Sequence, residues 1–208
     1  TITLNASGGI GAADDRFVLQ ANTLSSVNTG SNDAFLELQR ASVGTVTLTS
    51  LDAHHADIRS TDGGIDVGSG DWILSGGLTL SSAGAVSDSG KLVVAGSSTL
   101  AAGTGNDITL DNAANDFASV AIASGRVVTL RDLNDITVSG SVSSHFSVSG
   151  TAIGLGATSV GGNLTLSGNG AISDSGALTV TGSTSLAAGA GNDIVLDAAN
   201  DFGGAVSI

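Results

Sequence analysis

Apolar and polar residues alternate over short stretches along the whole chain, usually as a polar residue between two apolar ones. Alternation with period two is typical of β-strands, because successive side chains of a strand point to opposite faces. Gly, Ser, Asn and Asp, which favour turns, fill the intervals. The pattern therefore predicts short strands joined by turns, and no stretch has a helical period. The clearest strands are expected at residues 2–4, 35–38, 46–48, 65–67, 78–80, 108–110, 120–122, 136–138, 146–148 and 164–166.

A longer repeat is superimposed on this rhythm. The sequence of residues 76–122 returns at residues 161–208, and Asn106 corresponds to Asn192, 86 residues later. After the loss of one residue, Phe117 corresponds to Phe202. A long internal period indicates an architecture of stacked units. Leucines recur at a shorter step of 20 residues, from Leu80 to Leu100, from Leu110 to Leu130 and from Leu166 to Leu186.

Short strands at regular spacing fit either a β-sandwich or a β-solenoid. The brevity and similarity of the strands favour a solenoid with about 20 residues per coil. Residues 1–208 are interpreted as a single β-solenoid segment of a longer chain, with about ten coils and a length of roughly 50 Å at the usual strand spacing. Residues 76–160 and 161–208 are a full and a partial copy of the 86-residue repeat, and residues 1–75 are more divergent coils.

The composition agrees with a thin aliphatic core. Hydrophobic residues make up 41% of the chain but aromatic residues only 3%, and the mean hydropathy is +0.34, which argues against disorder. Proline is absent, as expected where almost every strand donates its N–H groups to neighbours. The absence of cysteine excludes disulfides and thiolate metal sites. Thr1 is not a start methionine, and we expect a piece of a longer or processed chain.

The net charge of −13 comes from 19 acidic and 6 basic residues, and Glu37 is the only glutamate. Such a balance disfavours nucleic acid, which requires clustered Lys and Arg, and anionic membranes. No apolar run approaches the roughly 20 residues that cross a bilayer. Because aspartate is a turn-forming acid, many of these charges are expected to lie in turns.

The stretch GNLTLSGNGAISDSGALTVTGSTSLAAGAGNDIVLDAANDFGGAVSI, residues 162–208, resembles repeats of large secreted bacterial adhesins of the filamentous haemagglutinin type. The resemblance covers most of residues 76–208 and is weaker over residues 1–75. It implies a right-handed parallel β-helix that serves as the shaft of an exported surface protein. The secretion domain of that family has no counterpart in this sequence.

The phrase Gly-x-Gly-Asn-Asp, at residues 103–107 and 189–193, partly matches the calcium-binding nonapeptide of tandem β-rolls. A calcium ion requires six to eight oxygen ligands, and a single phrase every 86 residues does not supply them. A tight turn with positive φ before strand 194–196 is favoured instead. Phe117 and Phe202 are expected to fill corners of the core, and Asn115 and Asn200 to cap turns by bonding their own backbone.

The sequence LDAHHADI, residues 51–58, contains the only local cluster of His and Asp. His54 and His55 between Asp52 and Asp57 could bind a transition metal if they lay in a loop, but in a strand they would point apart. A solvated turn is the favoured interpretation. His145 is isolated and is expected at a turn before Phe146.

Other candidate chemistry is sparse. Adjacent Asp14 and Asp15 beside Arg16 are the best candidates for a polysaccharide-cleaving site, but adjacent acids in an irregular loop are usually solvated, and the pair does not recur with a partner base. The remaining bases are scattered, although Arg126 and Arg131 flank one strand. The row Thr45, Thr47 and Thr49 resembles an ice-binding face, but the pattern is too interrupted elsewhere in the chain. Formal glycosylation sequons occur at Asn5 and Asn163, as chance alone predicts for a chain rich in Ser and Thr.

The sequence thus favours a structural shaft module of a secreted or bacterial cell-surface adhesin, or of an extracellular filament, without catalysis. No catalytic, cofactor-binding or metal-binding residue is assigned, and no cofactor is expected. The expected partners are neighbouring coils, further copies end to end, and a host or cell-surface glycan or protein. The alternative is a polysaccharide-binding or polysaccharide-cleaving β-helix protein.

Overall fold

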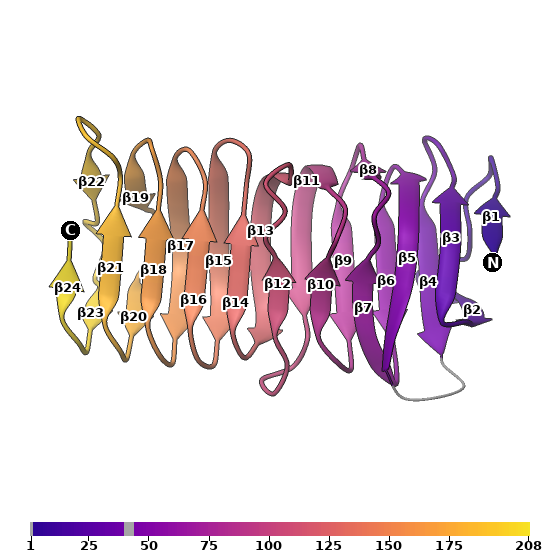
Figure 1. Ribbon diagram of the computed structural model, residues 1–208, viewed down its shortest axis with the longest axis horizontal. Helices are drawn as coiled ribbons and strands as arrows, with labels where there is room; N and C mark the ends of the chain where they lie inside the picture. The colour runs from indigo at the N-terminus through magenta and orange to yellow at the C-terminus, as the bar shows by residue number, and fades with distance from the viewer. Residues whose placement is uncertain (1, 40–43) are drawn as a thin grey trace.

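A computed structural model describes residues 2–39 and 44–208, and all regular secondary structure in these residues is β-strand. The chain winds as a right-handed solenoid of about ten coils, with the described ends at opposite ends of a rod (Figure 1). Every strand pairing between coils is parallel. The strands expected from the alternating triplets are all present, and the predicted β-solenoid is confirmed.

Each coil crosses three faces of the rod, and its strands stack on those of the coils before and after it. Face 1 runs along the whole rod and contains the first halves of β3 (Thr23–Asn28) and β5 (Gly44–Ala53), then β7 (Gly63–Val67), β10 (Val86–Asp88), β12 (Ile108–Leu110), β14 (Val128–Arg131), β16 (Phe146–Ser149), β18 (Leu164–Ser167), β21 (Thr184–Ala187) and β24 (Val206–Ser207).

Face 2 also runs the whole length. It contains β2 (Phe17–Gln20), β4 (Ala34–Gln39), β6 (Ala56–Ser60), β9 (Leu78–Ser82), the second halves of β11 (Leu92–Ala101) and β13 (Asp116–Gly125), the first halves of β15 (Ile136–Val142) and β17 (Ile153–Val160), then β19 (Ile172–Asp174) and β22 (Ile194–Val195).

Faces 1 and 2 are joined by a third face that lies on one side of the rod in its first part, where the chain passes from face 1 to face 2, and on the other side in its second part, where the chain passes from face 2 back to face 1. Face 3 contains β1 (Thr3–Asn5), the second halves of β3 and β5, β8 (Trp72–Leu74) and the first halves of β11 and β13. Face 4 contains the second halves of β15 and β17, then β20 (Leu178–Val180) and β23 (Asp201–Phe202).

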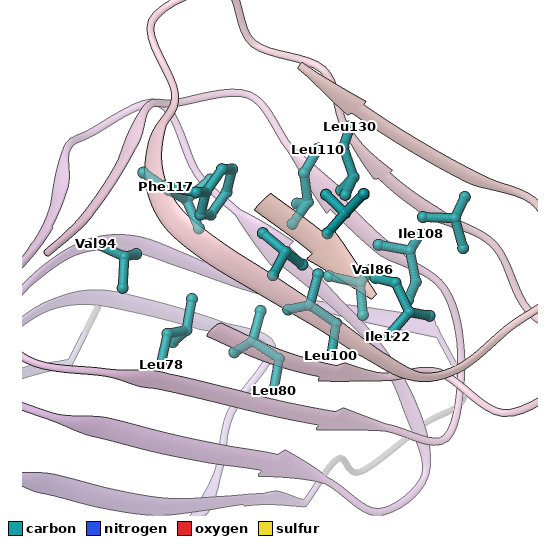
Figure 2. Close-up of a cluster of buried hydrophobic side chains, with 14 of the residues drawn as sticks. Leu78, Leu80, Val86, Val94, Leu100, Ile108, Leu110, Phe117, Ile122 and Leu130 are labelled. Atoms are coloured by element: carbon teal, nitrogen blue, oxygen red, sulfur yellow. The ribbon is translucent and has the colours of Figure 1, made fainter. Parts of the chain in front are cut away.

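The core consists of inward aliphatic side chains stacked in columns between the faces. Leu80 lies opposite Leu100, Leu110 opposite Leu130, and Leu166 opposite Leu186, as the spacing of 20 residues predicts. Figure 2 shows such side chains from successive coils meeting around the axis, with Phe117 filling a corner. Trp72 is also fully buried, and its indole N–H donates to the carbonyl of Leu48. Phe117 is buried as predicted, whereas Phe202 is only partly buried.

Coil length varies without disturbing the columns. Along face 1, the step between aligned residues is 22 residues from Val86 to Ile108 but only 18 from Val128 to Phe146. The turns absorb the difference, since the strands of face 1 stay in register. A column therefore depends on the inward residues and not on a fixed coil length.

The order in which a coil visits the faces changes in the middle of the rod. Before Phe117, each coil passes from face 1 to face 3 and then to face 2. From β14 onward, it passes from face 1 to face 2 and then to face 4. Gly140 lies at the change: its φ is +121°, and a Cβ there would approach the carbonyl oxygen of Ile122 to 2.0 Å. Only glycine fits this close backbone approach.

This change places the two copies of the repeat on different sides of the rod. Val86 and Leu164 lie in one column of face 1, four coils apart, through Ile108, Val128 and Phe146. Ile172, the counterpart of Val86, lies on face 2 beside Ile153. Conversely, Leu100 lies on face 2 and its counterpart Leu186 on face 1. The offset of 86 residues thus spans four coils and about half of the next, so equivalent residues point about half a turn apart.

Candidate functional site

Many of the polar side chains that link one coil to the next lie at the corners between faces, where they form a network of hydrogen bonds. The corner after β10 is its centre. The Asp88 carboxylate accepts hydrogen bonds from the backbone N–H groups of Asp111 and Asn112, at 3.1 and 3.2 Å, and from the Asn115 side-chain amide at 2.6 Å. Asn115 Oδ1 in turn accepts the N–H of Leu92 at 2.8 Å. Two consecutive coils are therefore joined in both directions.

Asn115 is fully buried, with 0% of its surface exposed. The expectation that this residue bonds its own backbone is wrong: its side chain reaches the preceding coil. A neighbouring coil lies about 4.8 Å away, which is within reach of a short side chain, and the amide supplies the donor and the acceptor that the corner lacks.

The second copy of the repeat reproduces this network. Asp174 accepts from the backbone N–H groups of Asp197 and Ala198 and from the Asn200 side-chain amide, at 3.0, 3.3 and 2.7 Å. Asn200 Oδ1 accepts the N–H of Leu178 at 2.8 Å. The repeated phrase recurs because it carries both halves of this connection.

The network extends into the coil after the first copy, where face 3 ends. The N–H of Leu133 donates to the Asn115 carbonyl at 2.7 Å. Asp132 is 5% exposed, and its carboxylate accepts the N–H groups of Phe117 at 2.6 Å and Asn134 at 2.8 Å. Asp132 thus provides the acceptor that a further strand of face 3 would have provided for Phe117.

Burial sets the electrostatics of this corner. The pKa of Asp88 is raised above its ordinary value because burial disfavours the charged form, although the hydrogen bonds from Asn115, Asn112 and Asp111 act in the opposite direction. The pKa of Asp132 is raised for the same main reason, against the hydrogen bonds from Phe117 and Asn134. In the first copy, the corner therefore combines desolvated acids with donors that stabilise their anions.

Other corners use the same device with single acceptors. Asp107 Oδ1 accepts the N–H of Val127 at 3.1 Å, and Asp135 Oδ1 accepts the N–H of Ala152 at 2.9 Å. The acceptors at two further corners are His145 Nδ1, for the N–H of Asn163, and Asn163 Oδ1, for the N–H of Ser183, both at 3.0 Å. A short acceptor at the end of one coil thus satisfies an amide of the next, which explains why the acids are aspartates.

Basic side chains also act between coils. Arg16 forms an ion pair with Asp57, Lys91 with Asp71 at 3.1 Å, and Arg126 with Asp107 at 2.7 Å. Two further bases, Arg59 and Arg131, lie on strands opposite Glu37 and Ser149, and Arg40 lies outside the described residues. Over the described ranges, these bases are distributed along the rod and do not gather in one groove.

The Gly-x-Gly-Asn-Asp phrase forms a turn, as predicted. Gly103, Gly189 and Gly191 have φ values of +77°, +79° and +83°. The side-chain amides of Asn106 and Asn192 donate to the carbonyls of Ala102 and Ala188, at 2.8 and 2.9 Å, which closes each turn. In the first copy, both oxygens of Asp107 are engaged by the next coil.

The His and Asp cluster does not converge. His54 and His55 lie in the bend between β5 and β6, as the turn interpretation predicts, and Asp57 is bound to Arg16. A different acid, Asp33, contacts His54 Nδ1 at 3.0 Å and accepts the N–H of His55 at 3.1 Å. The hydrogen bond from His54 lowers the pKa of Asp33. Because Asp33 lies one coil earlier, local sequence gave no sign of this contact.

The remaining candidates are separated from one another. Asp14 and Asp15 lie in an exposed turn, and Arg16 donates to Asp57, two coils away. Asn5 is exposed, while the Asn163 side chain is used at a corner. The Thr47 position continues as an outward column on face 1 that is interrupted by an acid, and this column comprises Thr47, Asp66, Ser87, Thr109, Thr129, Ser147, Thr165, Ser185 and Ser207.

In the part of the chain that the structure describes, no three His, Asp or Glu side chains gather as metal ligands would. Across residues 2–39 and 44–208, no helix has the length and apolar character needed to traverse a bilayer. A pocket of about 170 Å³ beside His145 is lined largely by Val127, Val128 and Phe146, and the ring nitrogen of His145 is already bonded to Asn163.

Stacked coils with a repeated corner network define a β-solenoid repeat protein. A family model described as repeats of unknown function (DUF5649) matches residues 44–124 and 140–208. These segments cover well over half of the chain, which belongs to this family of repeats. The unmatched interval between them contains Asp132, where face 3 ends. No curated protein and no solved structure matches the chain.

Proposed function

We propose that this chain is a rigid shaft segment of a secreted or cell-surface adhesin, or of an extracellular filament. The repeated β-solenoid is consistent with a structural repeat module. The observation that supports the shaft most strongly is the use of the polar side chains: buried Asn115 and Asp132 and half-buried Asp88 bond neighbouring coils. Three ion pairs likewise connect different coils. These groups resist the separation of coils along the axis.

The exterior supports an extracellular role in solution. Hydroxyl side chains form most of the outward column of face 1, and the net charge of −13 opposes aggregation of rods through their sides. The cysteine-free sequence tolerates an oxidising environment without mispaired disulfides. Adhesive parts would then be carried elsewhere, and this segment would provide reach.

Force spectroscopy tests the mechanical role. The chain is placed between two marker domains and pulled from its ends. A shaft is expected to resist and then unravel in small steps, each releasing about one coil, or roughly 70 Å for 20 extended residues. The Asn115→Ala variant is expected to lower the force of the steps around that corner, and Asn134→Ala, which removes one exposed bond to Asp116, serves as the matched control. Extension at forces typical of an unstructured chain would contradict the proposal.

Localisation and catalysis need separate measurements. Cells that express the natural gene are treated with protease, and accessibility of this segment on intact cells is expected. Turnover of acidic polysaccharides tests the enzymatic alternative, for which the Asp14→Asn and Asp15→Asn variants are the relevant controls. Turnover that these variants abolish would replace the shaft proposal.

A further inference from the structure

One corner of the rod differs between the two copies of the repeat in the residues that control its chemistry. Between β18 and β19, residues 168–170 read Gly-Asn-Gly, whereas residues 82–84 between β9 and β10 read Ser-Ala-Gly. In the first copy, the Ser82 hydroxyl accepts the backbone N–H of Gly84 at 3.2 Å and donates to the Gly63 carbonyl at 2.9 Å. The second copy lacks this hydroxyl and carries a side-chain amide directly before the glycine.

The backbone nitrogen of Gly170 is consequently accessible. Across residues 2–39 and 44–208, its N–H has no hydrogen-bond partner, and Gly170 lies in a bend outside the strands. The preceding Asn169 is exposed, and within the same ranges no hydrogen bond holds its side-chain amide. Because glycine has no Cβ, no side chain of Gly170 shields the nitrogen from the Asn169 side chain.

Other asparagines lack this combination. Asn169 is the only asparagine in the sequence that precedes a glycine. Asn5 and Asn163 are exposed as well, but the N–H that follows each of them is bonded to the next coil. Ala6 donates to the Asn28 carbonyl at 3.0 Å, and Leu164 donates to the Ser183 carbonyl at 2.9 Å. Asn5 and Asn163 are therefore internal references for the reactivity of Asn169.

We propose that Asn169 and Gly170 form a site of spontaneous deamidation in the folded rod, with water as the co-reactant. The Gly170 nitrogen loses its proton to hydroxide and bonds to Asn169 Cγ. The bond between Cγ and Nδ2 breaks, and water returns a proton to the departing nitrogen, which leaves as ammonia. Water then opens the cyclic imide. Opening at Cγ gives aspartate at position 169, and opening at the backbone carbonyl gives isoaspartate.

The products alter the contact between coils. Both add a negative charge, and isoaspartate also adds a carbon atom to the backbone between positions 169 and 170. This segment is held to the preceding coil by the N–H of Asn169, which donates to the Thr151 carbonyl at 3.1 Å, and by the Ala171 carbonyl, which accepts the N–H of Ile153 at 2.9 Å. A longer backbone between these two bonds is expected to speed hydrogen exchange of the two amides. The reaction does not depend on the proposed shaft function.

The test follows each asparagine separately. The intact chain is incubated at mildly alkaline pH, at a temperature at which circular dichroism shows it to be folded, and peptides are analysed by mass spectrometry. Asn169 is expected to lose its amide about tenfold faster or more than Asn5 and Asn163, a factor that corresponds to a barrier difference of about 1.4 kcal/mol. A rate at Asn169 no higher than at these two references would overturn the site.

The first copy supplies the matched control for the hydroxyl. Ala83→Asn, at an exposed position, creates an Asn-Gly pair whose glycine N–H is still held by Ser82. This new asparagine is expected to react more slowly than Asn169. Ser82→Gly combined with Ala83→Asn reproduces the Gly-Asn-Gly sequence of the second copy and is expected to bring the rate close to that of Asn169. Equal rates in the single and double variants, both folded by circular dichroism, would overturn the role of the hydroxyl.

Denatured chains separate the effect of the fold from that of the sequence. In concentrated urea, the asparagine of the Ala83→Asn variant and Asn169 are expected to react at the same rate, because Ser82 no longer holds the N–H of Gly84. A difference between them that persists in urea would assign the contrast to the flanking sequence and would overturn the structural argument.

Discussion

The two copies of the repeat have nearly the same sequence but different surroundings. The first copy is packed between coils on both sides, whereas the last coil of the second copy has a neighbour on one side only. Phe117 is fully buried, while its counterpart Phe202 is partly exposed. In a solenoid, the burial of a residue is thus determined by the coil about 20 residues before it and the coil about 20 residues after it.

Equivalent residues of the two copies also lie on different faces of the rod. Val86 lies on face 1 and its counterpart Ile172 on face 2, because the repeat spans four coils and about half of another. Leu100, on face 2, has its counterpart Leu186 on face 1, so the offset exchanges these two faces. A feature carried by both copies is therefore presented on two different faces of the rod and not along one side of it.

The largest expected difference between the copies concerns their phenylalanines. Phe117→Ala creates a cavity in a closed core and is expected to lower the free energy of unfolding by about 3–5 kcal/mol. Phe202→Ala is expected to cost about 1 kcal/mol, since part of its ring is already in contact with water. Urea unfolding followed by circular dichroism measures both, and Phe146→Ala, at another buried site, should resemble Phe117→Ala. Equal losses at Phe117 and Phe202 would mean that the last coil is covered in solution.

Loss of the corner asparagine should likewise cost more stability in the first copy than in the second. Asn115→Ala leaves the buried N–H of Leu92 without a partner and removes a donor from Asp88, so we expect a loss of about 2–3 kcal/mol. Asn200→Ala breaks the same bonds where water has access, and a loss of about 1 kcal/mol is expected. Urea midpoints of the two variants provide the comparison. A smaller loss at Asn115 than at Asn200 would contradict the assigned role of burial.

The pKa values of Asp88 and Asp132 are expected to differ from that of Asp33, which lies at a more exposed corner. The raised pKa values of Asp88 and Asp132 favour folding fully below the unfolded value of 3.8, and this contribution is lost as the pH rises through their folded values. For Asp33, whose pKa is lowered, the contribution is present above 3.8 and is lost as the pH falls through its folded value. Carboxyl carbon NMR shifts measure the three pKa values directly. A value for Asp88 below that for Asp33 would reverse the expected order.

The smallest effect is expected at a hydroxyl that both copies bury. Ser98 and its counterpart Thr184 have side-chain oxygens that are buried without a hydrogen-bond partner in the described structure. Ser98→Ala is expected to leave stability unchanged or to raise it by up to about 1 kcal/mol, because an unsatisfied polar group is removed. Ser97→Ala makes the same substitution at the exposed neighbouring position and serves as the control. A clear loss of stability in the Ser98 variant alone would indicate a bonding partner such as a buried water.

The strands and their stacking were accessible from the sequence, because a period of two identifies a strand and the step from Leu80 to Leu100 identifies the coil. The turn at Gly189 and Gly191 was also predictable, since its residue types suit positive φ. The corner network was not. Asp88 and Asn115 are 27 residues apart, and only a defined coil length places one beside the other. The same reason hid the contact of Asp33 with His54.

What the sequence by itself determined is the local geometry: where the chain extends, where it turns, and which side chains point inward. The packing of successive coils decided which polar groups meet, which residues are covered, and on which side of the rod each copy lies. Local alternation is a property of adjacent residues, whereas these outcomes depend on the accumulated lengths of several coils. A difference of a few residues in the turns, such as the step of 18 after Val128 compared with 22 after Val86, has no local signature but changes which corner meets which.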